Sequence, residues 1–526
     1  MVDVTIENAR DDLTKDDLLD MFIPDLDDFR DKTLKFAAKE ISVNEYKGFS
    51  GGYGSYAQRG GTAHMLRLRM AGGRITRERL KYIVDSMEKY EIPRAKLTTC
   101  QSVQFHDVKA EVLTDAMKDA WDAGMVSRGG GGDFSRNIMV SPLSGVEQGE
   151  YLDCLPYAEA ESAYVMQFVK RIKLPRKLKI CFCTNGKNET HATFRDLGFV
   201  ARPDGRLDVY IAGGLGNNPQ IGVKVAEGVE PNQIRYYIRA MVATFVENGN
   251  FKNRGRARTR YMQLDLGIDA LKAAFAKNLA DAYAGEDITV PDVSYVVSKK
   301  GNGETIIDKR VIPQKQEGLY AVFYQPVGGQ MVRGQFVSLW ETIKDMDQVE
   351  IRLTPEEGMY IINCNAEEAR KVLEATSDSA LTLFETSVAC IGATTCQVGL
   401  RDSQTALAAC IAAVRPENFA DGVLPRIHIS GCPSSCGTHQ IGAIGFRGAV
   451  KQTTNGPQPA FNIFLGGCAE AGKENLAPMG KSMLQADMPK FFVELGRMIA
   501  AENTTYDQWI IGHQDQLNEL VAKYTA

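Results

Sequence analysis

Two stretches of the 526-residue chain repeat one pattern: MAGGRITRERLKYIVDSMEKYEIPRAKLTTCQSVQFHDV at 70–108 and PVGGQMVRGQFVSLWETIKDMDQVEIRLTPEEGMYIINC at 326–364. Each predicts a strand, a Gly-Gly turn, a helix of about four turns, and two strands joined by a polar turn. Two shorter pairs follow in the same order: LPRKLKICF at 174 with LPRIHISGC at 424, and VYIAGGLG at 209 with IFLGGCAE at 463. Three pairs in one order indicate an internal duplication rather than chance similarity.

The duplication predicts an α+β protein whose two halves are related by a pseudo-twofold axis. Each half is expected to contain a small sheet-and-helix unit and a larger α+β unit, with a shared site in the cleft between the halves. The expected order is an N-terminal extension at 1–60, a first small unit at 61–130, a first larger unit at 131–284, a connector at 285–318, a second small unit at 319–380 and a second larger unit at 381–526.

Composition is that of an ordinary globular protein, with 44% hydrophobic and 24% charged residues. A net charge of −5 argues against a dedicated nucleic-acid binder. No apolar run is long enough to cross a bilayer, and the acidic start MVDVTIENARDD lacks the features of a secretory signal, so a cytoplasmic protein is expected. In that compartment the 11 cysteines are not expected to form disulfides, which makes some of them candidates for metal binding.

Four cysteines form the most specific motif: Cys390 and Cys396 in TSVACIGATTCQVG, and Cys432 and Cys436 in HISGCPSSCGTHQIG. Four thiolates complete the ligand set of a [4Fe–4S] cluster, and the neighbouring glycines would let backbone N–H groups approach its sulfurs. Zinc also accepts four thiolates, but the C-x5-C spacing fits a structural zinc site poorly. Simple burial is the other alternative, and we assign it to Cys154, Cys364, Cys410 and Cys468, which show no such spacing.

The C-x5-C and GCP-x2-C pair resembles the hallmark of the sulfite and nitrite reductase haemoproteins, and the resemblance covers roughly residues 50 to 500. The resemblance implies that the small units are ferredoxin-like half-domains. It implies two cofactors, sirohaem and a [4Fe–4S] cluster. Cys390, Cys396, Cys432 and Cys436 would hold the cluster, with the Cys436 thiolate shared with the sirohaem iron.

The same resemblance implies a catalytic set of four cations. Arg69 in MLRLRMAGG, Arg136 in RNIMVSP, and Lys177 and Lys179 in LPRKLK match the family positions that hold the substrate anion. Arginine would supply paired donors and lysine compact charge. Because a desolvated lysine among other cations has a lowered pKa, Lys177 and Lys179 are expected to relay protons.

Sirohaem carries eight carboxylates, so further cations and polar groups are expected around it. The expected contacts are Thr98, Gln104 and His106 in LTTCQSVQFHDV, Arg176 in LPRKLK, and Arg256 or Arg258 in NRGRARTR. A solvated charged face is the ordinary alternative for each cation, and RNA binding is a competing interpretation of residues 253–260. The chain departs from the family at three positions: Cys100 replaces an expected Arg, and Gly132 and Ser434 replace expected Asn residues.

The resemblance implies a sirohaem-dependent reduction of sulfite by six electrons. The Lys-x-Lys form of the 177–179 strand resembles that of sulfite reductases, whereas Lys-x-Asn resembles plant-type nitrite reductases. Lys179 therefore favours sulfite, whose dianion benefits from the additional cation; nitrite reduction at the same site is the alternative. A catalytically degenerate subunit and a zinc-stapled binding protein are more distant alternatives. No ferredoxin-type C-x2-C-x2-C run or strand-flanked G-x-G-x-x-G is present, so electrons are expected from a ferredoxin or a separate flavoprotein subunit.

Overall fold

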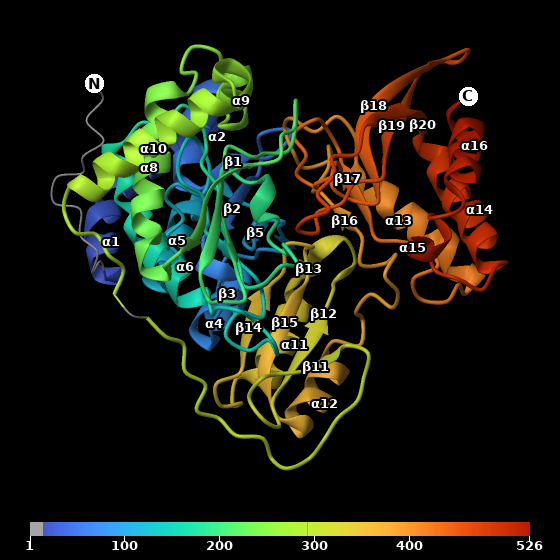
Figure 1. The fold of residues 1–526 in the computed structure, drawn as a ribbon, viewed down its shortest axis with the longest axis horizontal. Coiled ribbons are helices and arrows are strands. Elements are labelled where there is room, and N and C mark those ends of the chain that lie inside the picture. Colours follow the sequence, from blue (N-terminus) through green and yellow to red (C-terminus); the bar gives the residue numbers. More distant parts are fainter. Residues whose placement is uncertain (1–13, 292) are drawn as a thin grey trace.

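The computed structural model describes residues 14–291 and 293–526. Within them the strands form four five-stranded sheets (Figure 1). The sheet of the first half-domain has the order β1 (Ser55–Ala57), β2 (His64–Leu68), β5 (Val103–Val108), β4 (Arg94–Leu97), β13 (Gln330–Val332). The sheet of the second half-domain has the order β11 (Val311–Pro313), β12 (Tyr320–Tyr324), β15 (Met359–Cys364), β14 (Glu350–Leu353), β3 (Arg74–Ile75). The sheet of the first larger unit has the order β6 (Met139–Val140), β7 (Ile180–Cys183), β8 (Leu197–Ala201), β9 (Leu207–Ile211), β10 (Val223–Val229). The sheet of the second larger unit has the order β16 (Val388–Ala389), β17 (Ile427–Ser430), β18 (Ile444–Thr453), β19 (Gly456–Leu465), β20 (Met479–Leu484).

The sheet orders confirm the duplication. In both larger units the first three strands pair in parallel, and the fourth strand pairs antiparallel with both the third and the fifth. The half-domain sheets also correspond strand for strand, but each takes its fifth strand from the other half: β13 pairs with β4, and β3 pairs with β14. This exchange follows from the position of each short strand, directly after the Gly-Gly turn that carries the chain across to the neighbouring sheet.

The Gly-Gly turns require glycine. Gly72 and Gly328 have φ of 58° and 61°, a region that side-chain-bearing residues rarely adopt. A Cβ on Gly72 would also lie 2.6 Å from Val140 of the larger unit. The turn therefore lets the first half-domain pack directly against β6.

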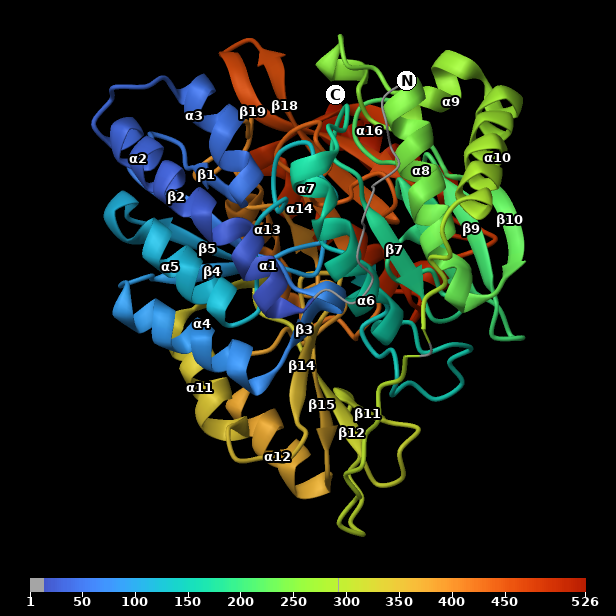
Figure 2. The ribbon, with the colours of Figure 1, turned by 90° about the vertical axis from the view of Figure 1, so that its left-hand side faces the viewer.

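Helices complete each unit. In the first half-domain, the Thr76 side chain caps α4 by accepting from the Arg79 backbone N–H, and Leu80, Ile83 and Met87 form its buried face. Across the pseudo-twofold axis α4 packs against α11 (Figure 2), and both half-domains contribute to one hydrophobic core. The helices are α1 (Lys15–Phe22), α2 (Leu26–Ala37), α3 (Val43–Ser50), α4 (Arg77–Lys89), α5 (Ala110–Asp122), α6 (Leu155–Met166), α7 (Phe168–Arg171), α8 (Ile234–Asn248), α9 (Arg260–Leu266), α10 (Ile268–Ala284), α11 (Arg333–Ile343), α12 (Ala366–Ala375), α13 (Ser403–Val414), α14 (Met488–Ala500), α15 (Tyr506–Trp509) and α16 (Gln514–Thr525).

Two expected boundaries are shifted by strand pairing. The range expected as an N-terminal extension packs Phe22 and Phe29 into the half-domain core and ends with β1, which pairs with β2. The range expected as a connector ends with β11, which pairs with β12 and so already belongs to the second half-domain. Backbone pairing across these borders was not visible in the local sequence pattern.

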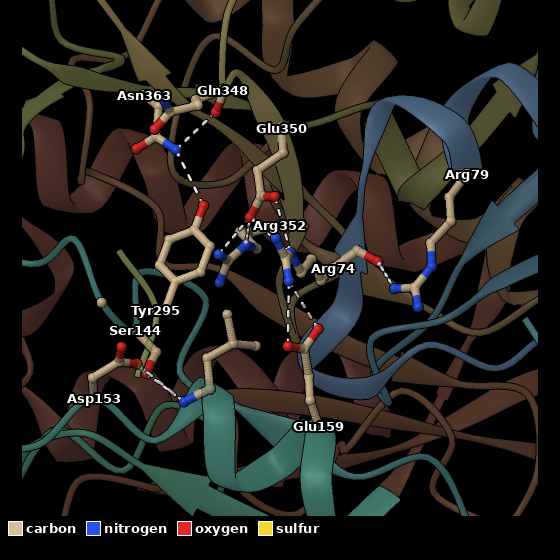
Figure 3. Close-up of polar contacts among 12 residues, drawn as sticks. Arg74, Arg79, Ser144, Asp153, Glu159, Tyr295, Gln348, Glu350, Arg352 and Asn363 are labelled. Carbon is tan, nitrogen blue, oxygen red and sulfur yellow. Dashed lines mark hydrogen bonds and ion pairs between the residues drawn. The ribbon is translucent and has the colours of Figure 1, made fainter. Parts of the chain in front are cut away.

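A buried ionic network joins the halves at the strand exchange (Figure 3). The Glu350 carboxylate on β14 accepts from Arg74 Nε on β3 at 2.9 Å and from Arg352 Nε at 2.7 Å. Arg74 also pairs with Glu159 at 3.1 Å. Because the Arg352 side chain is fully buried, Glu350 supplies the charge that makes its burial tolerable.

Candidate active site

The four cysteines of the motif lie in two loops at one edge of the C-terminal sheet. Cys390 directly follows β16, and Cys396 lies in the loop that leads to α13; Cys432 and Cys436 lie in the loop after β17. The Cys436 thiol interacts electrostatically with the other three thiols and with Lys177. Although the Cys436 side chain is exposed, burial of the surrounding region and the neighbouring Cys390 thiol raise its pKa to about 12. The positive charge of Lys177 acts in the opposite direction and favours the thiolate.

The local backbone is built around these sulfurs. The Gly431 N–H donates to Cys390 Sγ at 3.1 Å, and the Gly431 carbonyl accepts from Arg401 N–H at 2.9 Å. A Cβ on Gly431 would lie 2.4 Å from the Arg401 carbonyl, so no larger residue fits. From the first half, Arg59 donates to the Gly399 carbonyl at 2.7 Å and thereby fixes the loop that carries Cys396.

The pseudo-twofold axis relates the four-cysteine motif to positions in the first half that carry no cysteine. Strand β6 corresponds to β16, and β7 corresponds to β17. At the same distances after the ends of these strands, Ser141 and Glu147 correspond to Cys390 and Cys396, and Asn185 and Glu189 correspond to Cys432 and Cys436. The backbone contact persists, since Thr184 N–H donates to Ser141 Oγ at 3.2 Å. Asn185 donates to Glu147 at 2.8 Å, beside a cavity of about 500 Å³. The first half thus repeats the geometry but replaces every thiol with an oxygen- or nitrogen-bearing side chain.

The four predicted substrate cations come together opposite Cys436. Arg69 follows β2 and is 4% exposed; its Nη1 donates to the Ser135 carbonyl at 2.8 Å. Its Nε and Nη2 have no hydrogen-bond partner within the described chain. Arg136 donates to the Gly130 carbonyl at 2.9 Å and the Gly132 carbonyl at 2.7 Å. Backbone oxygens therefore hold both arginines in place, while at least one nitrogen of each guanidinium group remains without a hydrogen-bond partner in the described residues.

Burial and mutual repulsion perturb these cations strongly. Burial, with the charge of Arg136, lowers the pKa of Arg69 to about 9. Burial, with the charges of Arg258 and Arg136, lowers the pKa of Lys177 well below its usual value. The pKa of Lys179 is also lowered by burial, although the Cys100 thiol opposes that shift. A cluster of desolvated cations is stabilised by a bound anion.

The departure at Cys100 has a direct structural consequence. The Lys179 ammonium lies 3.1 Å from Cys100 Sγ, so one of the predicted substrate cations already has a partner. Burial raises the pKa of the Cys100 thiol, but the charges of Lys179 and Arg195 outweigh burial and lower it to about 6.

The other departures lie nearby. The Gly132 carbonyl holds Arg136, and Gly132 N–H donates to the Tyr56 hydroxyl at 2.8 Å. The Ser434 carbonyl lies against Gly216, in the GGLGNN segment. This segment is fastened to the cysteine loop by Gln440, which donates to the Gly216 carbonyl at 2.7 Å.

The expected sirohaem contacts fall into two groups. Gln104 is buried beside Arg67, and its amide oxygen accepts from that guanidinium at 2.9 Å in the orientation that satisfies both groups. Arg258 lies near Lys177 and donates to Asp196 at 2.9 Å, and its Nε has no hydrogen-bond partner among the residues described. These residues border the substrate cations.

The remaining expected contacts are engaged elsewhere. Thr98 bonds Ser102 at 2.8 Å within its own turn, and His106 bonds Gln58 at 3.0 Å inside the sheet. Arg176 pairs with Asp133 at 2.5 Å. Arg256 pairs with Asp265 at the surface, where its side chain is 43% exposed, because the turn Arg254–Arg256 carries it away from the buried cations.

Three residues around the site were missed from the sequence. Arg67 interacts with the Arg136 charge from the strand β2, and its alternation with Arg69 in MLRLRM was a usable signal. Arg195 and Asp196 precede β8: Asp196 accepts from Lys179 N–H at 2.8 Å and from Arg258, so it positions both cations. The segment FRDLGF, which contains Arg195 and Asp196, matches no motif that would have predicted their place beside the cations.

The side chains present fit a polynuclear iron–sulfur cluster next to a large anionic cofactor. The four neighbouring thiols and the N–H that donates to a sulfur fit the cluster, and Cys390, Cys396, Cys432 and Cys436 are the residues that would hold it. The anionic cofactor and a substrate anion beside it fit the buried guanidinium groups. Nitrogens on Arg69, Arg136 and Arg258 have no hydrogen-bond partner in the described ranges and could donate to such anions.

Fold and site together define a duplicated α+β redox protein that places a thiolate-bound cluster next to an anion-binding site. Residues 56–120 match the family model of the nitrite/sulfite reductase ferredoxin-like half domain, and residues 131–282 match that of the nitrite and sulphite reductase 4Fe-4S domain. The chain belongs to the sulfite and nitrite reductase haemoprotein family, and its cofactors are sirohaem and a [4Fe–4S] cluster. The second match falls on the first larger unit, which has other residues at the four corresponding positions, whereas the four cysteines lie in the second larger unit.

Similar proteins cover most of the chain. The chloroplastic ferredoxin–nitrite reductase of Zea mays is 26% identical over 77% of this chain and 73% of the maize protein. The assimilatory ferredoxin-dependent nitrite reductase of Haloferax mediterranei is 24% identical over 87% of this chain and 84% of its own length. The structure of Mycobacterium tuberculosis NirA matches 96% of this chain and 97% of its own with a TM-score of 0.75 at 21% identity, which establishes the fold. Among the described helices, none has the length and apolar character needed to span a membrane.

Proposed function

We propose that this enzyme reduces nitrite to ammonium and receives its six electrons from a ferredoxin. The names of the maize and Haloferax relatives, both ferredoxin-dependent nitrite reductases, support the substrate and the donor. The sequence favoured sulfite, with nitrite as the alternative, and these relatives favour the alternative.

The observation that carries anion reduction is the pair of buried Arg69 donors without partners in the described structure. Leaving such donors unsatisfied is unfavourable, so the site is completed by an anion whose oxygens accept from them. When bound, sirohaem and the cluster would transfer the donor's electrons to the anion; the chain itself binds and orients the anion through Arg69 and Arg136.

The pairing of Lys179 supports nitrite over sulfite. Sulfite was favoured because Lys179 offered an additional cation for a dianion. Since the Lys179 ammonium contacts Cys100 Sγ at 3.1 Å, that charge is engaged before substrate arrives. Nitrite, a monoanion, requires less positive charge.

Protons must accompany the electrons, because reduction of nitrite to ammonium and two waters consumes eight protons. Lys177 is suited to donate them: burial and the charges of Arg258 and Arg136 lower the pKa of its ammonium group well below the usual value. After each transfer, water can return a proton to the Lys177 amine.

The test is turnover by the anaerobically purified holoenzyme, whose visible spectrum establishes cofactor content. We expect a higher kcat/KM for nitrite than for sulfite with reduced ferredoxin as the donor. A higher value for sulfite would establish the other substrate, and activity only with a flavoprotein would overturn the donor. Absence of turnover in fully loaded protein would identify a degenerate subunit.

A further inference from the structure

Cys100 occupies a rigid turn between β4 and β5. Thr98 N–H donates to the Ser102 carbonyl at 3.1 Å and closes the turn. Gln101, at φ 50°, donates to the carbonyls of Val140 and Leu353, each at 2.8 Å, which fixes the turn to a larger unit and to the other half-domain. These hydrogen bonds hold the backbone on both sides of Cys100 and so fix the point from which its thiol extends.

Lys179 reaches this thiol from the opposite side. Its backbone N–H is held by Asp196 at 2.8 Å, and its ammonium lies 3.1 Å from Cys100 Sγ. Arg195 and Arg67 add positive charge around the same sulfur. A thiol between three cations is favoured as the thiolate, because each charge stabilises the anion.

We propose that Cys100 is a specificity-determining residue, whose thiolate neutralises Lys179 and so favours a monoanionic over a dianionic substrate. The inference rests on the proposed nitrite-reducing function and explains how that preference arises in a site that has both lysines.

The mechanism is electrostatic and requires no bond to Cys100. With the thiolate present, the charges facing the anion are those of Arg69, Arg136 and Lys177, while Lys179 is compensated. Without it, the Lys179 ammonium strengthens binding of the more highly charged anion more than that of nitrite, because the interaction scales with the product of the charges.

The decisive experiment compares Cys100→Ser and Cys100→Asp in the cofactor-loaded enzyme. The serine variant removes the negative charge, and we expect the ratio of kcat/KM for sulfite to that for nitrite to rise about tenfold or more. The aspartate variant retains a negative charge and should keep the wild-type ratio. Cys181→Ala is the matched control, since that buried thiol lies on neighbouring β7 and burial raises its pKa to about 12.

A pH profile separates charge from shape. The groups facing the thiol are Lys179, Arg195, Arg67 and Arg136, and the thiol pKa of about 6 places its protonation within an accessible range. As the pH falls through this value, the wild-type sulfite-to-nitrite ratio should rise relative to that of Cys100→Ser, which has no thiolate to lose.

The outcomes distinguish this proposal from the proposed function. An unchanged ratio in a fully loaded serine variant would overturn the role of Cys100 while leaving nitrite reduction intact. A wild-type preference for sulfite would overturn the proposed function, whatever the variants do. If the serine variant fails to load cofactors, Cys100→Asp takes its place in the pH comparison, because its carboxylate keeps its charge where the Cys100 thiolate is protonated. The wild-type ratio should then rise relative to that of the aspartate variant as the pH falls, and parallel profiles would overturn the proposal.

Discussion

Replacing Arg69 by lysine tests whether its free guanidinium donors, rather than its charge alone, hold the substrate. Arg69 is 4% exposed, and one of its terminal nitrogens is bound to the Ser135 carbonyl at 2.8 Å. Nε and Nη2 have no hydrogen-bond partner in the described residues. Lysine keeps the positive charge but cannot present two donors in one plane.

The magnitude follows from those two donors. A hydrogen bond to a charged group contributes about 1.5–3 kcal/mol, so two of them contribute about 3–6 kcal/mol. Lost from the transition state, this lowers kcat/KM by about 100- to 10,000-fold. The protein should not lose stability in parallel, because burial and the Arg136 charge already oppose the charged guanidinium and lower its pKa to about 9.

The assay is steady-state nitrite reduction by holoenzyme whose iron content and visible spectrum match those of the wild type. Thermal unfolding of the same samples reports stability. Arg370→Lys is the control, because Arg370 is an exposed residue paired with Glu304 at the surface and should behave as wild type. A kcat/KM for Arg69→Lys within about threefold of the wild type would refute the reasoning.

Three further perturbations test the framework of the site. Glu350→Gln should lower the free energy of unfolding by about 3–5 kcal/mol in denaturant titration, since it leaves fully buried Arg352 without its counter-charge. Cys432→Ser should lose most of the cluster iron and its visible absorbance, whereas Cys410→Ser, buried in the C-terminal core, should retain both. Glu189→Gln should stabilise the protein by about 2–3 kcal/mol more at pH 8 than at pH 5, measured by denaturant titration at each pH. Burial and the Glu147 charge raise the carboxyl pKa of Glu189 from 4.5 to about 7, so the wild type loses this stability as the pH rises through 7.

Each of these has an outcome that contradicts it. A stability loss below 1 kcal/mol for Glu350→Gln, typical of exposed ion pairs, would mean that solvent screens the network. Iron retained in Cys432→Ser would remove that residue from the ligand set. A stability difference for Glu189→Gln that does not depend on pH would show that the Glu189 carboxyl is not perturbed in the folded protein.

Much of the fold was accessible from local patterns. The strand, Gly-Gly turn, helix and strand order of residues 70–108 and 326–364 appears in the structure, with Thr76 capping α4 as its position before the helix suggests. These features depend on periodicity and backbone conformation within a few residues. The exchange of β3 and β13 was not predictable in this way, because it depends on which sheet edge lies nearest after the turn.

The duplication, the four cysteines and the arginines and lysines on nearby strands can be recognised in the chain before it folds, since covalent spacing and residue type suffice for these. Which of the charges are paired and which stay available depends on the folded arrangement. Lys179 meets Cys100 across 79 residues of sequence, and Arg256 is turned to the surface toward Asp265. Charge is a property of the residue, but the field at a site depends on distances and desolvation that exist only after folding. That is why the Lys-x-Lys pattern alone could not show that the Lys179 ammonium is paired with Cys100 in the folded protein.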